Sequence, residues 1–329
     1  MNMKNQTDTN APAWSASYTR AKRLKYHGYI VLDDVLEHQD EVRKLREFSN
    51  LVGFVTAERS LRCKYPEAEG EKMEKMTEEH LKEEGKRIRF LDSLGFTVGW
   101  PLPLSNLVEE MNLDEFRRQL RVIEKHMPEM RLVDFVYILD EPNFRDVPTE
   151  TLEAFIAAFK EVFPNVKTWF CYAIVHPKFL DAVPPQNADL LCIDPYMFSK
   201  QYTHTAADFE YFYHESLACA LEWINRWDKP FLLAGDCFYS RDPNSNKRPP
   251  RPETTLWYYQ LALTQPKCVG LIWFYYGNTP IESENLKGFN LSESPEALKN
   301  MHRDIGAAIL GEPTPLGLQR DSFGPAPEE

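Results

Sequence analysis

Two adjacent carboxylates end an apolar segment near the middle of the chain. Asp140 and Glu141 follow the apolar run 136–139 and precede Pro142. Partial burial and mutual repulsion raise the pKa of one of two neighbouring carboxyls, which keeps it protonated near neutral pH. A protonated carboxyl is what a general acid needs to protonate a glycosidic oxygen. A structural role is the alternative, in which the two acids cap the next helix or pair with Arg145.

Three further acids end apolar runs in the same way. They are Asp33, Asp194 and Asp236. A buried strand does not need a terminal carboxylate, so these side chains are candidates for binding or chemistry. For Asp194, hydrogen bonding to a substrate hydroxyl or to a neighbouring loop is the simpler interpretation.

Aromatic side chains gather at the same segment ends. Sugar rings have apolar C–H faces that stack on aromatic planes, while their hydroxyls bond to polar groups. We therefore expect Trp100 and Trp273 to be stacking platforms, and His176 to donate or accept a hydrogen bond, although alternate strand positions can equally face the core. The predicted substrate-binding residues are Asp194, Tyr196, Trp273, Trp100, His176, Tyr172, Asp33 and Tyr275.

The elements that carry these residues alternate regularly along the chain. Short runs rich in Val, Ile, Leu and aromatic residues are separated by stretches with helical periodicity, which is typical of βα units. The predicted strands are 29–34, 52–56, 96–100, 133–140, 168–174, 190–194, 231–236 and 269–275. The clearest predicted helix is 149–163, and another begins at Asn112 with Glu115 three residues on.

Eight such units favour a closed barrel over an open doubly wound sheet. Neither GxGxxG nor GxxxxGK[ST] follows the first strand, which removes the main reason for an open nucleotide-binding sheet. We therefore predict an α/β fold, a single-domain (β/α)8 TIM barrel over residues 25–310. Residues 1–24 form an N-terminal extension, and residues 311–329 form a Pro-rich tail.

A barrel of this kind carries its active site at the carboxyl ends of the strands. The fourth and seventh strands lie across the barrel from each other, so Asp236 is predicted as a second catalytic carboxylate opposite Glu141. The long loops 237–252 and 277–293 are candidate lids, and the Glu- and Lys-rich segment 67–87 is predicted as a solvated helix.

Composition narrows the possible partners. The net charge of −12 and the lack of a basic stripe argue against nucleic acid, and no apolar run is long enough to cross a membrane. The six cysteines show no CxxC spacing and are expected to be reduced core residues. Without a signal-like N-terminus, we expect a cytoplasmic protein. No His-x-His lies on a strand, so we expect no metal and no cofactor.

The chain resembles the glycoside-hydrolase barrels over roughly residues 25–310. In clan A glycosidases an Asn-Glu-Pro-like motif ends the fourth strand and a glutamate ends the seventh; the matching positions here are Asp140-Glu141-Pro142 and Asp236. Asp for Asn removes an amide that contacts the sugar 2-hydroxyl, and Asp for Glu shortens the nucleophile. The motif is also similar to that of substrate-assisted N-acetylhexosaminidases, which implies that Asp140 polarises an acetamido group and Glu141 protonates the leaving group.

The sequence therefore predicts a glycosidase, an O-glycosyl hydrolase, with Glu141 as general acid/base and Asp140 or Asp236 as the second catalytic group. The substrate is expected to be a neutral or amino-sugar glycoside. Two alternatives from other classes stay open. One is a carbohydrate-binding barrel without catalysis, and the other is a metal-assisted lyase or isomerase that uses the acidic rim.

Overall fold

Eight parallel strands close into a barrel in the computed structural model, which describes residues 24–54, 70–174, 178–196, 206–240, 250–277 and 286–311. Their order around the barrel follows the chain. The strands are β1 (Tyr26–Val31), β2 (Leu51–Phe54), β3 (Thr97–Pro101), β4 (Phe135–Asp140), β5 (Lys167–Ala173), β6 (Leu190–Asp194), β7 (Phe231–Asp236) and β9 (Cys268–Tyr276). This arrangement confirms the predicted (β/α)8 barrel. All eight predicted strands are present, and the largest displacement is at β1, which begins three residues before the predicted start at Tyr29.

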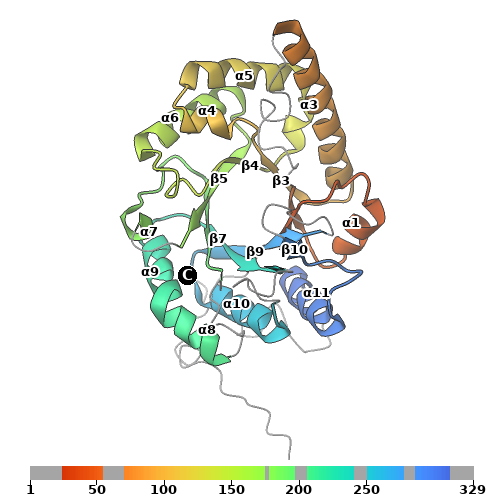
Figure 1. The fold of residues 1–329 in the computed structure, drawn as a ribbon, viewed down its shortest axis with the longest axis vertical. Coiled ribbons are helices and arrows are strands. Elements are labelled where there is room, and N and C mark those ends of the chain that lie inside the picture. The colour runs from red at the N-terminus through yellow and green to blue at the C-terminus, as the bar shows by residue number, and fades with distance from the viewer. Residues whose placement is uncertain are drawn as a thin grey trace, which may run out of the picture.

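Helices surround this barrel, as Figure 1 shows. They are α1 (Gln39–Leu45), α3 (Gly70–Ser93), α4 (Ser105–Glu109), α5 (Leu113–His126), α6 (Thr149–Val162), α7 (Lys178–Asp181), α8 (Ala206–Phe212), α9 (Ala218–Arg226), α10 (Pro252–Thr264) and α11 (Glu296–Leu310), with a 3-10 turn at Pro128–Leu132 and a π-helical turn at Tyr213–Leu217. The Asn112 side chain accepts a hydrogen bond from the Glu115 backbone N–H at 3.2 Å, so it caps α5 as predicted.

The two faces of the barrel wall pack differently. Side chains at alternate strand positions fill the interior floor, among them Leu51, Phe135, Leu190, Leu232 and Ile272. The other positions pack with the helices in one large outer core. The open end of the interior therefore lies at the carboxyl ends of the strands, above this floor.

A buried polar cluster fastens α11 to the barrel wall. The Trp273 indole N–H donates to His27 Nε2 at 2.8 Å, so His27 Nδ1 carries the proton and donates to the Phe48 carbonyl at 2.7 Å. The Tyr29 hydroxyl lies 2.9 Å from His302 Nδ1. At Gly306 of α11, a Cβ atom would lie 1.9 Å from the Phe48 carbonyl oxygen, so only glycine allows this close packing.

The two predicted lid loops join each other beyond the barrel. Strand β8 (Phe238–Ser240) follows β7, and β10 (Leu286–Gly288) follows β9; they pair antiparallel as a separate two-stranded sheet. Phe238, Tyr275 and Leu286 form a small hydrophobic cluster there. Residues 241–249 and 278–285 of these loops lie outside the described residues.

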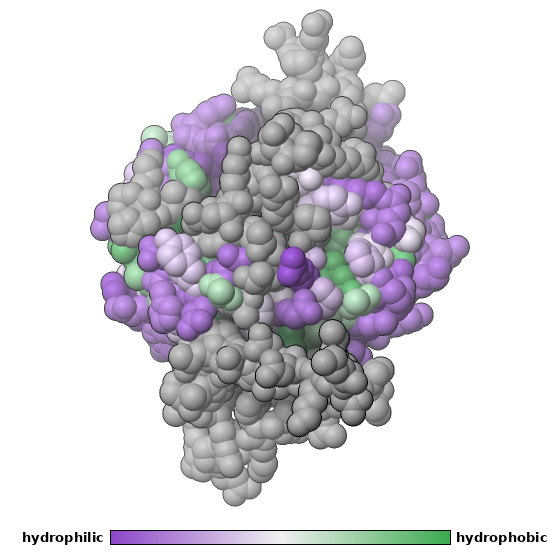
Figure 2. Space-filling model, turned by 60° about the horizontal axis from the view of Figure 1, so that its bottom comes forward, coloured by the Kyte–Doolittle hydropathy of each residue, from purple (hydrophilic) through white to green (hydrophobic). Residues whose placement is uncertain are grey.

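The described surface is mainly hydrophilic (Figure 2), and most of the described cysteines are buried. In Figure 2 most of the described surface is hydrophilic, and hydrophobic residues show only in small areas. Cys171, Cys192, Cys237 and Cys268 are buried free thiols, whereas Cys219 is exposed and does not belong to the core. Among the described helices, none combines the length and the apolar character needed to cross a membrane.

Candidate active site

A cavity of about 140 Å³ opens at the carboxyl ends of the barrel strands; we call it the barrel cavity. It is lined by Ile30, Gly53, Phe54, Gly99, Trp100, Pro101, Tyr137, Asp140, Glu141, Trp169, Cys171, Cys192, Asp194, Tyr196, Ala234, Ile272 and Phe274. A void of about 150 Å³ in another protein admits a benzene ring, so this space suits one six-membered ring. Within the described part of the chain, no group of three or more His, Cys, Asp or Glu side chains is placed to hold a metal ion.

Small residues at inward-facing positions make room for this cavity. Gly53 of β2 and Gly99 of β3 are direct strand partners, and Ala234 of β7 also lines the space. A Cβ atom at Gly53 would lie 2.6 Å from the Ile30 side chain. Larger residues at these positions would fill the space that a ligand needs.

Glu141 occupies a strained position at the mouth of the barrel. It follows the last residue of β4 and has a φ of +47°, in the left-handed region that non-glycine residues rarely adopt. Its carbonyl accepts the Phe144 N–H at 2.9 Å in the turn that follows. Backbone strain of this kind costs on the order of 1–3 kcal/mol and is concentrated at functional sites. Asp146 also has a positive φ, but it does not line the barrel cavity, so Glu141 is the cavity-lining acid, among the described residues, that combines this conformation with access to the site.

Asp194 of β6 contacts Glu141 across the cavity wall. Both side chains line the barrel cavity, where their carboxyls interact. Asp194 is only 7% exposed, and its Oδ1 atom has no hydrogen-bond partner among the described residues. Burial, and then the neighbouring Glu141 carboxyl, raise the pKa of Asp194 well above its usual range.

Asp140 is held by a tyrosine that sequence reasoning missed. The Tyr137 hydroxyl donates to Asp140 Oδ1, and the Tyr137 ring lies 5.2 Å from the Trp169 ring between centroids. Burial, and then the Asp140 charge, raise the pKa of Tyr137 well above its usual value, so the hydroxyl remains a donor. The signal was available in principle, because Tyr137 lies three residues before Asp140 on the same predicted strand.

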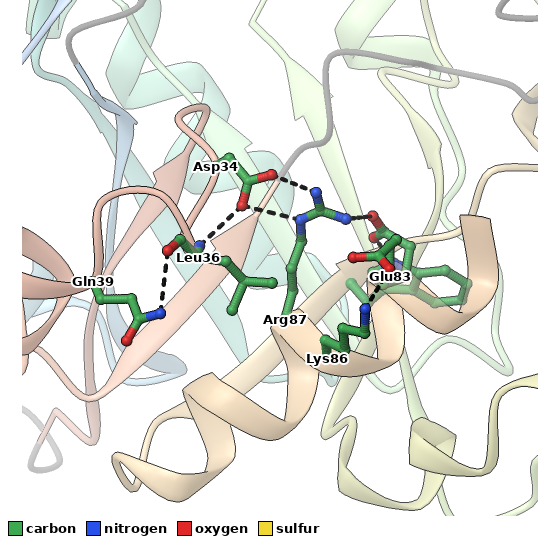
Figure 3. A network of polar contacts seen from close by, with 8 residues as sticks. Asp34, Leu36, Gln39, Glu83, Lys86 and Arg87 are labelled. Carbon is green, nitrogen blue, oxygen red and sulfur yellow. Dashed lines mark hydrogen bonds and ion pairs between the residues drawn. The ribbon is translucent and has the colours of Figure 1, made fainter. Parts of the chain in front are cut away.

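Trp100 lines the cavity, and a hydrogen bond to α3 holds its indole ring in place. The indole N–H donates to the buried carboxylate of Glu84 on α3 at 2.9 Å. Burial raises the pKa of Glu84 to about 7, against the opposing hydrogen bonds from Trp100 and Arg87. Figure 3 shows the Arg87 side chain, which extends from α3, paired with Asp34, which follows β1. Asp34 is therefore part of a structural ion-pair network.

Two predicted aromatic ligands lie on the opposite side of the barrel wall. Trp273 is buried in the cluster against α11, with its ring centroid 4.7 Å from that of His302. Tyr172 packs against Trp223 of α9 at 5.1 Å. In both strands the cavity is lined instead by an aromatic residue whose side chain points to the other side of the strand. These residues are Phe274 in β9 and Trp169 in β5. Trp273 and Tyr172, which were predicted to face the substrate, therefore lie on the helix side of the barrel wall and do not line the cavity.

The remaining predicted ligands have mixed positions. Tyr196 lines the cavity, with its ring 5.5 Å from that of Phe238. The Tyr275 hydroxyl donates to the Leu286 carbonyl at 2.9 Å, so Tyr275 packs against the two-stranded sheet of β8 and β10. Asp33 packs against Gly277, where a Cβ atom would lie 3.0 Å from its carboxyl group. His176 lies outside the described residues.

Asp236, predicted as a second catalytic carboxylate, is not among the residues that line the barrel cavity. It is 3% exposed, and a hydrogen bond connects it to Tyr258 of α10. Tyr258 in turn donates to the Pro195 carbonyl. Asp236 Oδ1 has no hydrogen-bond partner among the described residues, so the observation that separates Asp236 from a substrate is its absence from the cavity lining.

An Asp236→Asn variant is expected to remove a pH-dependent loss of stability. Burial raises the pKa of Asp236 from 3.8 to about 7. The unfolded chain therefore releases this proton first as pH rises, so stability is lost between about pH 4 and 7, by up to roughly 4 kcal/mol. Denaturant unfolding at both pH values should show a smaller decrease for the variant. An equal decrease in both proteins would show that Asp236 ionises normally.

Comparisons with known proteins support the fold. No family model matches the chain, and no curated protein sequence matches it. Among solved structures, a β-glucosidase matches with a TM-score of 0.58 and 12% identity, covering 84% of this chain and 88% of that one. A xylanase from Cellvibrio japonicus matches with 0.55 and 12%, covering 86% and 97%, and a GH113 β-mannanase from Alicyclobacillus acidocaldarius with 0.51 and 11%, covering 87% and 97%. These matches show that the chain shares its (β/α)8 barrel fold with these three proteins.

Proposed function

We propose that the protein is a glycoside hydrolase in which Glu141 is the general acid/base. The observation that carries this proposal is the position of Glu141: it projects from a left-handed turn at the end of β4 into a cavity sized for one ring. The neighbours in fold are described as a β-glucosidase, a xylanase and a β-mannanase, which is consistent with such chemistry.

The cavity offers both kinds of contact that a sugar needs. Trp169, Tyr196 and Phe274 present aromatic surface, while Asp140 and Glu141 present carboxyl oxygens. A ring bound against the aromatic groups would place its glycosidic oxygen near Glu141. Proton donation from Glu141 to that oxygen then assists cleavage of the C–O bond through an oxocarbenium-like transition state.

Asp140 is the candidate for the second role in this site. It lines the cavity, and the Tyr137 hydroxyl holds one of its oxygens, which leaves the carboxylate oriented toward a substrate. With an N-acetylated sugar, Asp140 would polarise the acetamido group, as the Asp-Glu-Pro resemblance implies. With other sugars it would accept a hydrogen bond from a ring hydroxyl.

A screen of nitrophenyl glycosides, including N-acetylated ones, tests the proposal. We expect hydrolysis of at least one, unaffected by a metal chelator. Sugar binding without hydrolysis would contradict the proposal and favour a carbohydrate-binding barrel. Hydrolysis or elimination that a chelator abolishes would contradict it in favour of metal-assisted chemistry.

A further inference from the structure

The contact between Glu141 and Asp194 joins two strands that do not pair with each other. Glu141 follows β4 and Asp194 ends β6, with β5 between them. Both side chains nevertheless line the small barrel cavity, and the Glu141 carboxyl is one of the groups that raise the pKa of Asp194. No Lys, Arg or His is among the described residues that line this space, so none of them neutralises the pair with a positive charge.

Two carboxyls that face the same small cavity can share a proton. An ionised carboxylate only accepts hydrogen bonds, so a hydrogen bond between the two groups requires that one of them is protonated. Two carboxyls in contact cannot both ionise readily, because each charge opposes the other. The surroundings strengthen this effect, because the other described titratable groups that interact with Asp194 carry no positive charge; they are Asp140, Tyr137, Cys171, Cys192, Tyr196 and Tyr258.

We propose that Asp194 is a positioning residue that shares one proton with Glu141, so that the two carboxyls act together as the acid of the site. This inference rests on the proposed function of Glu141. In the reaction, Glu141 gives a proton to the glycosidic oxygen as the C–O bond breaks, and the bonding electrons stay on that oxygen. Water supplies a hydroxyl group to the anomeric carbon, and its remaining proton returns to the pair.

Burial of Asp194 agrees with this assignment. Desolvation, followed by the Glu141 carboxyl, raises the pKa of Asp194 well above its usual range, which favours a proton on the pair. The titration belongs to the two groups together. Removing the ionisable group at Asp194 should therefore change how Glu141 titrates.

An Asp194→Asn variant tests the pair through its pH profile. Asparagine keeps a polar side chain of the same size but cannot carry the negative charge that opposes ionisation of Glu141. The alkaline limb of kcat/KM should move to lower pH, with about a tenfold loss of activity above that limb for each pH unit moved. Alkyl glycosides, which need a proton on the leaving oxygen, should lose more activity than nitrophenyl glycosides.

Asp189→Asn is a matched control. Asp189 precedes β6 at the opposite end of the barrel, where it pairs with Lys160 at 2.8 Å. This variant should leave the pH profile unchanged. An unchanged profile in Asp194→Asn as well would overturn the proposal while the proposed glycosidase activity stands.

Infrared spectroscopy of protein with ¹³C-labelled aspartate provides a readout that does not need activity. At about pH 8, where Asp236 is mostly ionised, the wild type should show the carbonyl band of a protonated aspartic acid, and Asp194→Asn should lack it. Absence of the band from the wild type would overturn the proton-sharing pair. Presence of the band in a protein that hydrolyses no glycoside would support the pair and contradict the proposed function.

Discussion

Replacing Glu141 with glutamine is expected to reduce hydrolysis of an alkyl glycoside by about 10²- to 10⁴-fold, the usual contribution of a general acid. Glutamine has nearly the same shape and still forms hydrogen bonds, but its amide cannot deliver a proton to a leaving oxygen. Sugar affinity should therefore survive. Steady-state kinetics would measure the first effect, and calorimetric titration with the product sugar would measure the second.

The control for this experiment is Glu150→Gln, which makes the same change at an exposed position in the first turn of α6. It should leave both activity and affinity unchanged. A loss of less than tenfold in Glu141→Gln would contradict the assignment of the acid. Loss of sugar affinity together with unchanged turnover would instead make Glu141 a binding residue.

Replacing Trp273 with alanine is expected to lower the free energy of unfolding by about 3–5 kcal/mol. The indole is fully buried between β9 and α11, and its N–H is the donor that His27 Nε2 accepts. The variant would leave a cavity and remove the proton donor of a buried histidine. Burial lowers the pKa of His27 to about 4, so the ring is neutral and depends on that donor.

Denaturant unfolding would measure this loss, with Tyr211→Ala as the control. Tyr211 is an aromatic residue on α8 that is 49% exposed, so its removal should change stability by well under 1 kcal/mol. If Trp273→Ala were as stable as the wild type but bound sugar weakly, Trp273 would be a stacking platform as the sequence suggested.

Strand positions were predictable from the sequence, but the direction of their side chains was not. Each βα unit has an apolar run of strand length, and this pattern is enough to locate a strand. Both faces of a parallel barrel strand are buried, however, so the pattern does not alternate. In β5, Trp169 and Tyr172 differ in parity, and the sequence gives no reason to prefer either one. An error of one residue moves a side chain to the other side of the wall.

The sequence likewise predicted which acids lie at strand ends, but not which of them line the cavity. The rule that strand ends share one edge was sufficient to place Asp140, Glu141 and Asp194 together, and all three line the barrel cavity. The same rule included Asp236, whose partner is Tyr258. Tyr258 lies on α10, twenty-two residues later in the chain, and no local sequence pattern around Asp236 predicts this contact. Long-range contacts of this kind require the folded geometry.

The antiparallel pairing of β8 with β10 has a consequence for engineering the mouth of the barrel. Backbone hydrogen bonds tie the excursion after β7 to the excursion after β9, with Phe238 opposite Gly288 and Ser240 opposite Leu286. If only one of these two loops were exchanged for a loop from another barrel, the short strand in the remaining loop would lose its partner and expose an unpaired edge. The two segments are thus one transplantable module, and a chimera that aims to change substrate preference must carry both.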